Sequence, residues 1–174
     1  MDWSKAKTIL IVALLITNII IGSAYISGIN KEKANMEAAA RNAATYAQSR
    51  GVNVRCEIPA EKNKLPVLFV SLDRSGIAEE CHYKGIAVET DKSFVGRIIP
   101  EGQGDADAEL ISASNALLKL IGDMGESDMT IDDISVVYWL DLSLGDDAAA
   151  KDTAVPAWKF SGPDGVYYIE AFGE

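Results

Sequence analysis

Residues 8–30 read TILIVALLITNIIIGSAYISGIN, a run of 23 residues without a charged side chain in a chain of 174 residues. At 1.5 Å per residue, a helix of this length extends about 35 Å, enough to cross a hydrocarbon core about 30 Å thick. The run therefore predicts a transmembrane helix over 8–30, preceded by a short leader at 1–7. Trp3 is expected at one membrane interface and Tyr25 at the other.

A cleaved signal peptide is the alternative interpretation of this run. Gly22, Ser23 and Ala24 supply small residues after an apolar stretch of about 14 residues, as a cleavage site requires. The apolar character resumes after Ala24 and fills a complete span. A retained anchor is therefore favoured over cleavage.

The orientation of the helix does not follow from charge alone, because lysines flank it on both sides, at positions 5 and 7 and at positions 31 and 33. The run begins close to the N-terminus and the rest of the chain follows it. We therefore expect a plasma-membrane protein with its N-terminus in the cytoplasm and its C-terminal domain outside.

The composition of residues 31–174 restricts the partners of this domain. It holds 25 acidic residues against 14 Lys and Arg, a formal net charge of −11. Such a charge argues against a nucleic-acid partner. It also disfavours close docking on anionic lipid.

The chain after the apolar run predicts an α+β domain. Residues 31–51 are rich in alanine, which favours a juxtamembrane helix that packs on its own domain and stops at Gly51. Residues 52–174 form the predicted extracytoplasmic domain, an antiparallel sheet with packed helices. Its first part shows short apolar runs with punctuating glycine and proline, typical of strands, at 54–58, 66–72, 85–89 and 94–99, before a break at 101–104.

Residues 105–174 predict a helix followed by three strands. The apolar spacing over 107–124 is that of an amphipathic helix, with Asp105 or Asp107 as its N-cap. Alternating apolar residues then predict strands at 134–142, 155–161 and 165–171, the last two joined by a hairpin turn. Trp158 and Tyr168 are expected on the side of the sheet that faces the helix.

The residues that catalysis and metal binding usually require are few. His82 is the single histidine, and the sequence holds no nucleophile elbow, phosphate-binding loop or paired metal-ligand spacing. We expect no catalytic residue, cofactor or metal site. Cys56 and Cys81 either form a disulfide, which would close a loop of about 25 residues and contribute roughly 3 kcal/mol, or remain free thiols.

Both ends of the sequence resemble the YycI family of membrane-anchored regulators. The resemblance covers most of the chain in order and lies in the stretches MDWSKAKT at 1–8, SRGV at 49–52, IP at 58–59, LPVL at 65–68, PAWK at 156–159 and VYYIEAFGE at 166–174. It implies a non-enzymatic single-pass protein. With a YycH-type partner, such a protein adjusts the WalK-type sensor histidine kinase of the WalK/WalR (YycG/YycF) two-component system, which governs cell-wall metabolism.

In that family the transmembrane helix is thought to contact the kinase. Asn18 attracts attention here because an amide in hydrocarbon gains about 0.5 to 2 kcal/mol from a hydrogen bond to another helix. The alternative is that the Asn18 side chain forms its hydrogen bonds with its own backbone or with water, as a lone polar residue can. The candidate partner-binding face is Ile11, Leu14, Asn18, Gly22 and Tyr25.

The C-terminal helix and three strands are also similar to a PepSY-type module, a fold found in protease propeptides and inhibitors. This similarity implies a second function, that of a membrane-anchored inhibitor or chaperone of an extracytoplasmic hydrolase. Fold similarity alone does not decide between the two.

Overall fold

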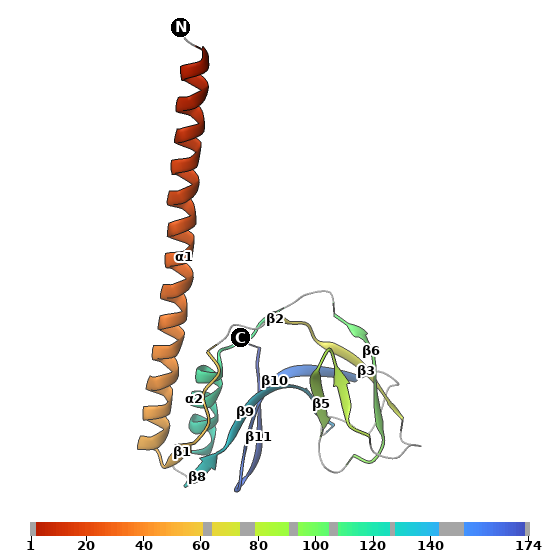
Figure 1. The fold of residues 1–174 in the computed structure, drawn as a ribbon. Coiled ribbons are helices and arrows are strands. Elements are labelled where there is room, and N and C mark those ends of the chain that lie inside the picture. The colour runs from red at the N-terminus through yellow and green to blue at the C-terminus, as the bar shows by residue number, and fades with distance from the viewer. Residues whose placement is uncertain are drawn as a thin grey trace. The chain divides into compact units, whose positions relative to one another are not determined.

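The computed structural model describes residues 3–60, 64–73, 79–90, 94–104, 108–125, 128–142 and 152–172 (Figure 1). The chain divides into two compact units, Met1–Ala38 and Ala39–Glu174, and the boundary falls within the first helix. The elements are α1 (Trp3–Ser49), β1 (Val52–Val54), β2 (Lys64–Leu65), β3 (Leu68–Asp73), β4 (Cys81–Tyr83), β5 (Ile86–Thr90), β6 (Arg97–Gln103), β7 (Ala108–Glu109), α2 (Ala113–Met124), β8 (Met129–Ile131), β9 (Asp133–Leu140), β10 (Asp152–Gly162) and β11 (Gly165–Glu170).

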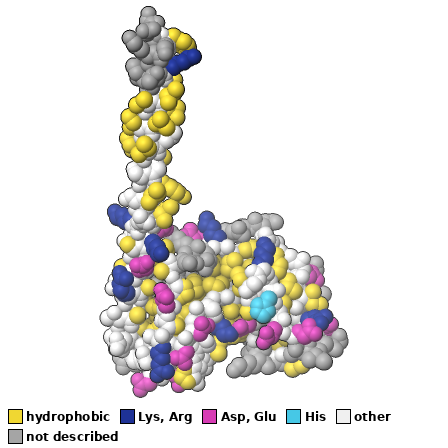
Figure 2. All heavy atoms as spheres, in the orientation of Figure 1, with side chains coloured by type: hydrophobic (Ala, Val, Ile, Leu, Met, Phe, Trp, Pro, Cys, Tyr) yellow, Lys and Arg dark blue, Asp and Glu magenta, His cyan; other side chains and the backbone are white. Residues whose placement is uncertain are grey.

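The first unit is a single helical segment with exposed apolar side chains. Its helix is long and apolar enough to cross a membrane, and its most apolar window has a mean hydropathy of 2.2 with none of it buried. Figure 2 shows a band of hydrophobic side chains around this segment. Exposed apolar side chains of this kind are unfavourable in water, so the segment is a candidate membrane span.

The second unit begins with the last turns of α1. Ala43 and Ala47 are buried in the domain core, which confirms that this helix packs on its own domain. Tyr46, between these two alanines in the sequence, remains 42% exposed. Gly51 follows the helix with φ of 87°, a left-handed conformation that stops a helix and favours glycine.

The main sheet has the strand order β4-β5-β9-β10-β3-β6, and β11 pairs with β10 beside this path. Most neighbours are antiparallel, as predicted, but β5 and β9 are parallel, as are β1 and β8 in a separate two-stranded sheet. The prediction of an antiparallel sheet is therefore wrong at these two pairs. A parallel neighbour needs a long crossover, and the chain between β5 and β9 supplies it with β6, β7, α2 and β8.

Strand β10 organises this sheet. Along one edge it pairs with β9 from Val155 to Ser161, and along the other it pairs first with β3 and then with β11. The two ends of the sheet, β4 and β6, approach each other, since Lys84 Nζ donates to Gln103 Oε1 at 2.8 Å. The sheet therefore curls strongly at this end (Figure 1).

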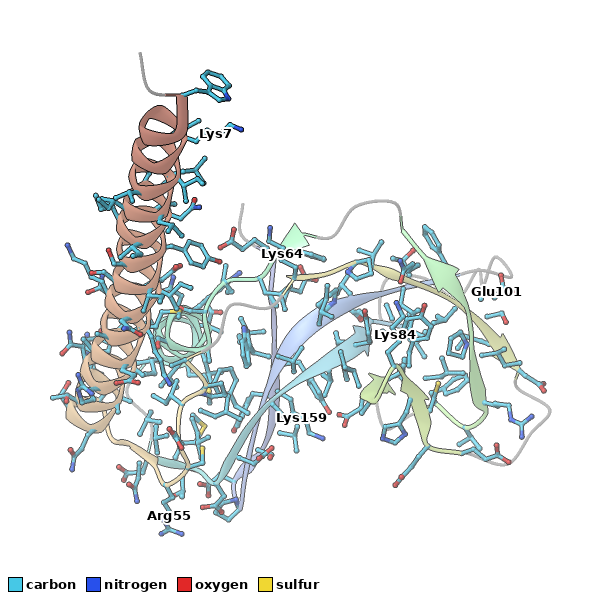
Figure 3. The ribbon with its side chains drawn as sticks, turned by 45° about the horizontal axis from the view of Figure 1, so that its top comes forward. Lys7, Arg55, Lys64, Lys84, Glu101 and Lys159 are labelled. Atoms are coloured by element: carbon cyan, nitrogen blue, oxygen red, sulfur yellow. The ribbon has the colours of Figure 1, made fainter. Side chains whose placement is uncertain are left out.

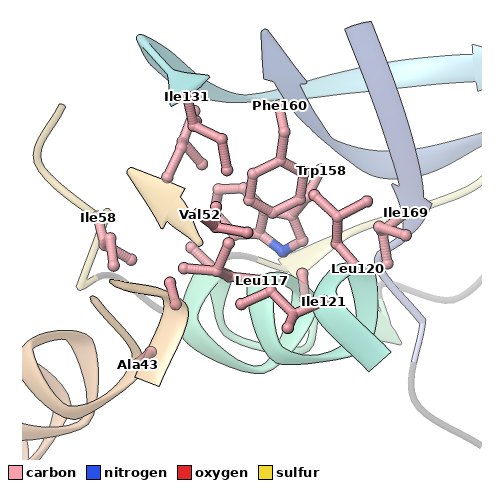
Figure 4. Close-up of a cluster of buried hydrophobic side chains, with 14 of the residues drawn as sticks. Ala43, Val52, Ile58, Leu117, Leu120, Ile121, Ile131, Trp158, Phe160 and Ile169 are labelled. Carbon is pink, nitrogen blue, oxygen red and sulfur yellow. The ribbon is translucent and has the colours of Figure 1, made fainter. Parts of the chain in front are cut away.

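The first hydrophobic cluster lies between α2 and the sheet (Figure 4). Trp158 and Phe160 on β10 meet Leu117, Leu120 and Ile121 on α2. The cluster also takes in Val52 of β1, Ile131 of β8, Ile169 of β11 and the two buried alanines of α1. A second cluster, formed by Leu68, Val70, Val88, Ile98, Tyr138, Leu140 and Ala154, fills the curled end of the sheet.

Helix α2 is shorter than predicted. It spans Ala113–Met124 and is capped by Ser112, whose side-chain oxygen accepts the Asn115 N–H. The predicted caps at 105 and 107 lie outside the described residues. Leu110 forms an isolated bridge to Phe172, and Ile111 N–H donates to Ala171 O. These long-range hydrogen bonds hold the backbone extended where the local apolar spacing predicts a helix.

Two of the strand predictions were also wrong in their bounds. The run 54–58 is not a strand, because the chain leaves β8 after Arg55 N–H donates to Ile131 O. The expected break at 101–104 lies mostly within β6, which continues to Gln103 beside β3. The 161–165 turn is confirmed, and its Gly162 has no space for a Cβ because the Thr130 carbonyl lies against it.

Replacing Trp158 by alanine is expected to lower the free energy of unfolding by about 3 to 5 kcal/mol. Its ring is 1% exposed, and its Nε1 donates to Ile111 O at 2.8 Å. Denaturant unfolding of the full chain in detergent, followed by circular dichroism, measures the loss. As a control, Val95→Ala, at a 70% exposed position, should change the stability by less than about 0.5 kcal/mol. Equal stability of the two variants would contradict the packing described here.

Candidate functional site

The five residues proposed as a partner-binding face lie on one helical segment of α1. Ile11, Leu14, Asn18, Gly22 and Tyr25 follow one another at steps of three or four residues. At 100° per residue they occupy an arc of about 80°. All but Gly22, which is half-buried, are exposed. The helix therefore brings the five together on one side.

Asn18 differs from Ser23, another polar residue of this segment. The hydroxyl of Ser23 donates to Ile20 O at 2.9 Å, so its hydrogen-bonding capacity is met by its own helix. For the exposed Asn18 amide, no side-chain hydrogen bond is found within the part of the chain that the structure describes. An amide has two N–H donors and a carbonyl acceptor available to another helix.

Cys56 and Cys81 are free thiols in the structure, so it does not support a disulfide between them. Cys56 packs beside the first hydrophobic cluster and Cys81 beside the second. Burial raises the pKa of both thiols. Because the thiolate is the reactive form of cysteine, a raised pKa lowers the fraction of each cysteine that is reactive near neutral pH.

His82 lies on β4 next to Cys81, but the two side chains do not converge. Cys81 turns toward the second cluster whereas His82 is exposed, as alternation along a strand requires. Among the described residues, no group of three or more His, Cys, Asp or Glu side chains is arranged to hold a metal ion.

A cluster of polar and aromatic side chains covers the face of the sheet opposite α2. Glu89 Oε1 accepts Lys159 Nζ at 2.6 Å, and Glu89 Oε2 accepts Tyr168 OH at 2.7 Å. The Tyr168 ring stacks on Trp139, with centroids 3.8 Å apart and planes at 18°. Figure 3 shows the position of Lys159 on the sheet. We call Glu89, Trp139, Lys159 and Tyr168 the outer-face cluster.

The position of Tyr168 corrects the prediction that it faces the helix. In the hairpin, Trp158 is opposite Ile169, and Tyr168 is opposite Lys159. Residues opposite each other in antiparallel strands share a face, so Tyr168 points away from Trp158 and α2. A shift of one residue in the assumed register exchanges the two faces.

The outer-face cluster depends on a small residue beneath it. Trp139 is on β9 and Tyr168 on β11, with β10 between them. Their rings meet above β10, where Ala157 is completely buried. A larger side chain at this position would separate the rings. The cluster therefore joins β5, β9, β10 and β11 on the outer face through two hydrogen bonds to Glu89 and one ring stack.

Sequence reasoning did not find the outer-face cluster. The alternation of residues in the hairpin is a local signal that could have placed Lys159 beside Tyr168. Glu89 gives no such signal, because it lies 70 residues from Lys159 and 79 from Tyr168 in the sequence.

A shallow apolar groove lies between the last turns of α1 and the first turns of α2. It has a volume of about 590 Å³ and is lined by Ala39, Asn42, Ala43, Tyr46, Ser114, Asn115 and Leu118. None of these side chains is an ionisable acid or base of the kind that catalyses proton transfer near neutral pH. The groove therefore supplies a contact surface but no reactive group.

The sequence matches no protein-family model and no curated protein. Within the described residues, the Asn18 face of α1 combines an exposed apolar helix with an amide for which no side-chain hydrogen bond is found.

The outer-face cluster predicts a loss of stability at high pH. Burial, together with the hydrogen bond and the negative charge of Glu89, raises the pKa of Tyr168 above its usual value of about 10. Above that pH the unfolded state loses the phenol proton while the folded state keeps it, so the free energy of unfolding falls. The contribution is fully present below about pH 10.

The comparison of wild type with Tyr168→Phe isolates this effect. Chemical unfolding midpoints measured from about pH 8 to about pH 11 should fall more steeply for the wild type than for the variant. The other tyrosines and lysines titrate in both proteins and cancel in the difference. Parallel pH curves would mean that the Tyr168 hydroxyl is not held by Glu89.

Proposed function

We propose that this protein is a single-pass membrane regulator without an active site of its own. It modulates a sensor histidine kinase of the bacterial plasma membrane, of the type that governs cell-wall metabolism, through contacts of its N-terminal helix. The observation that carries this proposal is the Asn18 face of α1, in which an exposed amide lies within an apolar helical segment.

The physical basis is the solvent properties of the bilayer. Lipid tails do not drive apolar helices together, so helices associate through close packing and through hydrogen bonds between polar side chains. Asn18 supplies the polar group, and Gly22, one turn further along, leaves room for a partner helix. An interhelical hydrogen bond from Asn18 contributes about 0.5 to 2 kcal/mol.

The resemblance to the YycI family supports the identity of the partners. It points to the transmembrane region of a WalK-type kinase and to a YycH-type regulator beside it. The family's anchored α+β architecture is compatible with the apolar helix and sheet-rich domain described above.

The topology in this proposal places the N-terminus in the cytoplasm and the domain outside. The domain's net charge of −11 keeps it away from the anionic membrane surface.

In the alternative function, a PepSY-type inhibitor of an extracytoplasmic hydrolase, α2 and the strands β9, β10 and β11 would form the inhibitory unit. That alternative is supported by the packing of α2 across these strands, and it requires no specific membrane helix.

Photo-crosslinking in native membranes tests the helix contact. A crosslinker at position 18 is expected to capture a transmembrane helix of a sensor kinase, identified by mass spectrometry. Ile20 provides the matched control, because two residues at 100° each place it about 160° away on the same exposed helix.

Asn18→Leu should weaken the association by about 2- to 30-fold, whereas Asn18→Gln should retain most of it.

Exchanging the apolar helical span distinguishes the proposed kinase regulator from the alternative hydrolase inhibitor. Replacing residues 8–30 with a generic Leu/Ala helix should abolish kinase regulation, because the Asn18 face is lost. An inhibitor of a hydrolase would remain active with any anchor. Normal function of the exchanged protein, or capture of lipid alone from position 18, would contradict the regulator.

Protease accessibility tests the topology. Protease added to intact cells, after removal of the outer wall barrier, should digest residues beyond the span and leave a short protected N-terminal fragment. An epitope placed at each end of the chain reports the two products. Full protection of the C-terminal epitope would contradict an extracytoplasmic domain.

A further inference from the structure

The outer edge of β11 has no strand partner among the residues that the structure describes. The strand spans Gly165–Glu170 and pairs with β10 along its inner edge. Its C-terminal end is held by Ile111, whose N–H donates to Ala171 O. The unpaired edge therefore extends over the length of β11 itself.

The direction of the backbone groups follows from the register. Ala171 N–H donates to Pro156 O, so residue 171 turns its N–H toward β10. In an antiparallel ladder the direction of the backbone N–H and C=O groups alternates from residue to residue. Ile169 and Tyr167 therefore also turn these groups toward β10. Val166, Tyr168 and Glu170 therefore direct their N–H and C=O groups away from β10, toward the open edge.

This edge lacks the features that protect other edges of the sheet. Strand β6 contains Pro100, pairs with β3 across a register shift, and approaches β4 through Gln103. Strand β4 is only three residues long. Strand β11 has no proline, lysine or bulge along its six residues. Unprotected edges of this kind are sites where an additional strand can bind.

The side chains along the edge indicate the chemistry of the partner. Val166 offers an exposed aliphatic contact, and Glu170 is exposed on the same face of the strand, whereas the Tyr168 ring is stacked on Trp139. A positively charged residue opposite Glu170 would gain a cross-strand ion pair. A second copy of the chain fits less well, because each chain carries a net charge of −10 and two copies repel.

We propose that the open edge of β11 binds an extended, positively charged segment of another protein by strand addition. The backbone groups of Val166, Tyr168 and Glu170 supply the hydrogen bonds, and Glu170 selects the charge. This surface belongs to the domain and does not depend on the Asn18 face, so either can fail without the other.

A designed peptide tests the proposal on the full chain in detergent micelles. The probe is a fluorescent, end-blocked peptide of sequence TKTVTVK, which in antiparallel register places its first lysine opposite Glu170 and its valines opposite Tyr168 and Val166. We expect saturable binding by fluorescence anisotropy. Amide hydrogen exchange should slow at residues 166, 168 and 170 and stay unchanged at 167 and 169.

Variants of the edge provide the matched controls. Val166→Pro removes one outward N–H without removing a hydrogen bond to β10, and Gly165 before it tolerates a following proline. Val166→Thr keeps the N–H. Binding should weaken at least about tenfold for Val166→Pro and for Glu170→Lys, and remain within about twofold for Val166→Thr.

A change in the peptide gives a test that requires no protein variant. N-methylation of the residues opposite 166, 168 and 170 blocks the peptide's hydrogen bonds to the edge and should abolish binding. Three results would overturn the proposal. They are absence of binding by the unmodified peptide, equal binding of the N-methylated peptide, and a dimer in sedimentation that Val166→Pro converts to a monomer, which would make a second copy the occupant.

Discussion

The hydrogen bond from Trp158 Nε1 to Ile111 O, made beneath α2, holds the domain together at the point where helix meets sheet. It requires the chain before α2 to be extended, so that the Ile111 carbonyl faces the indole. The same segment donates its N–H to Ala171 O and fixes the end of β11. The position of α2, the start of its helix and the C-terminal end of the hairpin thus depend on one buried aromatic residue.

The curled sheet has two different faces because β10 alternates between them. Its inward residues, including Trp158 and Phe160, contribute to the hydrophobic cores. Outward, Ala157 and Lys159 form the base and one side of the outer-face cluster. A carboxylate that accepts both an ammonium and a phenol is well satisfied, so this cluster stabilises the sheet.

Among the described residues, the Asn18 side chain and the open edge of β11 both retain unused hydrogen-bonding capacity. The two surfaces differ in their surroundings. Asn18 lies within an apolar helical segment. In the proposed membrane setting a single amide has a large effect, because water is excluded from a bilayer core. The edge of β11 presents a row of backbone groups in a strongly acidic domain. The first surface suits a membrane helix and the second an extended basic segment.

The sequence by itself determined the features that depend on local pattern. The apolar run, the stop at Gly51, the amphipathic stripe of α2 and the hairpin around residues 161–165 follow from hydrophobic length, periodicity and turn chemistry, which act between near neighbours. For the same reason, the shared face of Ile11, Leu14, Asn18, Gly22 and Tyr25 could be predicted, since helical geometry alone places them together.

Tertiary structure decided what depends on contacts between distant residues. Leu110 and Ile111 fit a helical pattern but are extended because Phe172 and Ala171 pair with them. The face occupied by Tyr168 depends on the hairpin register, and its bond to Glu89 depends on a parallel neighbour brought in by a long crossover. The open edge of β11 is likewise a property of strand order. Strand order is set by the packing of the whole sheet, which no local pattern encodes.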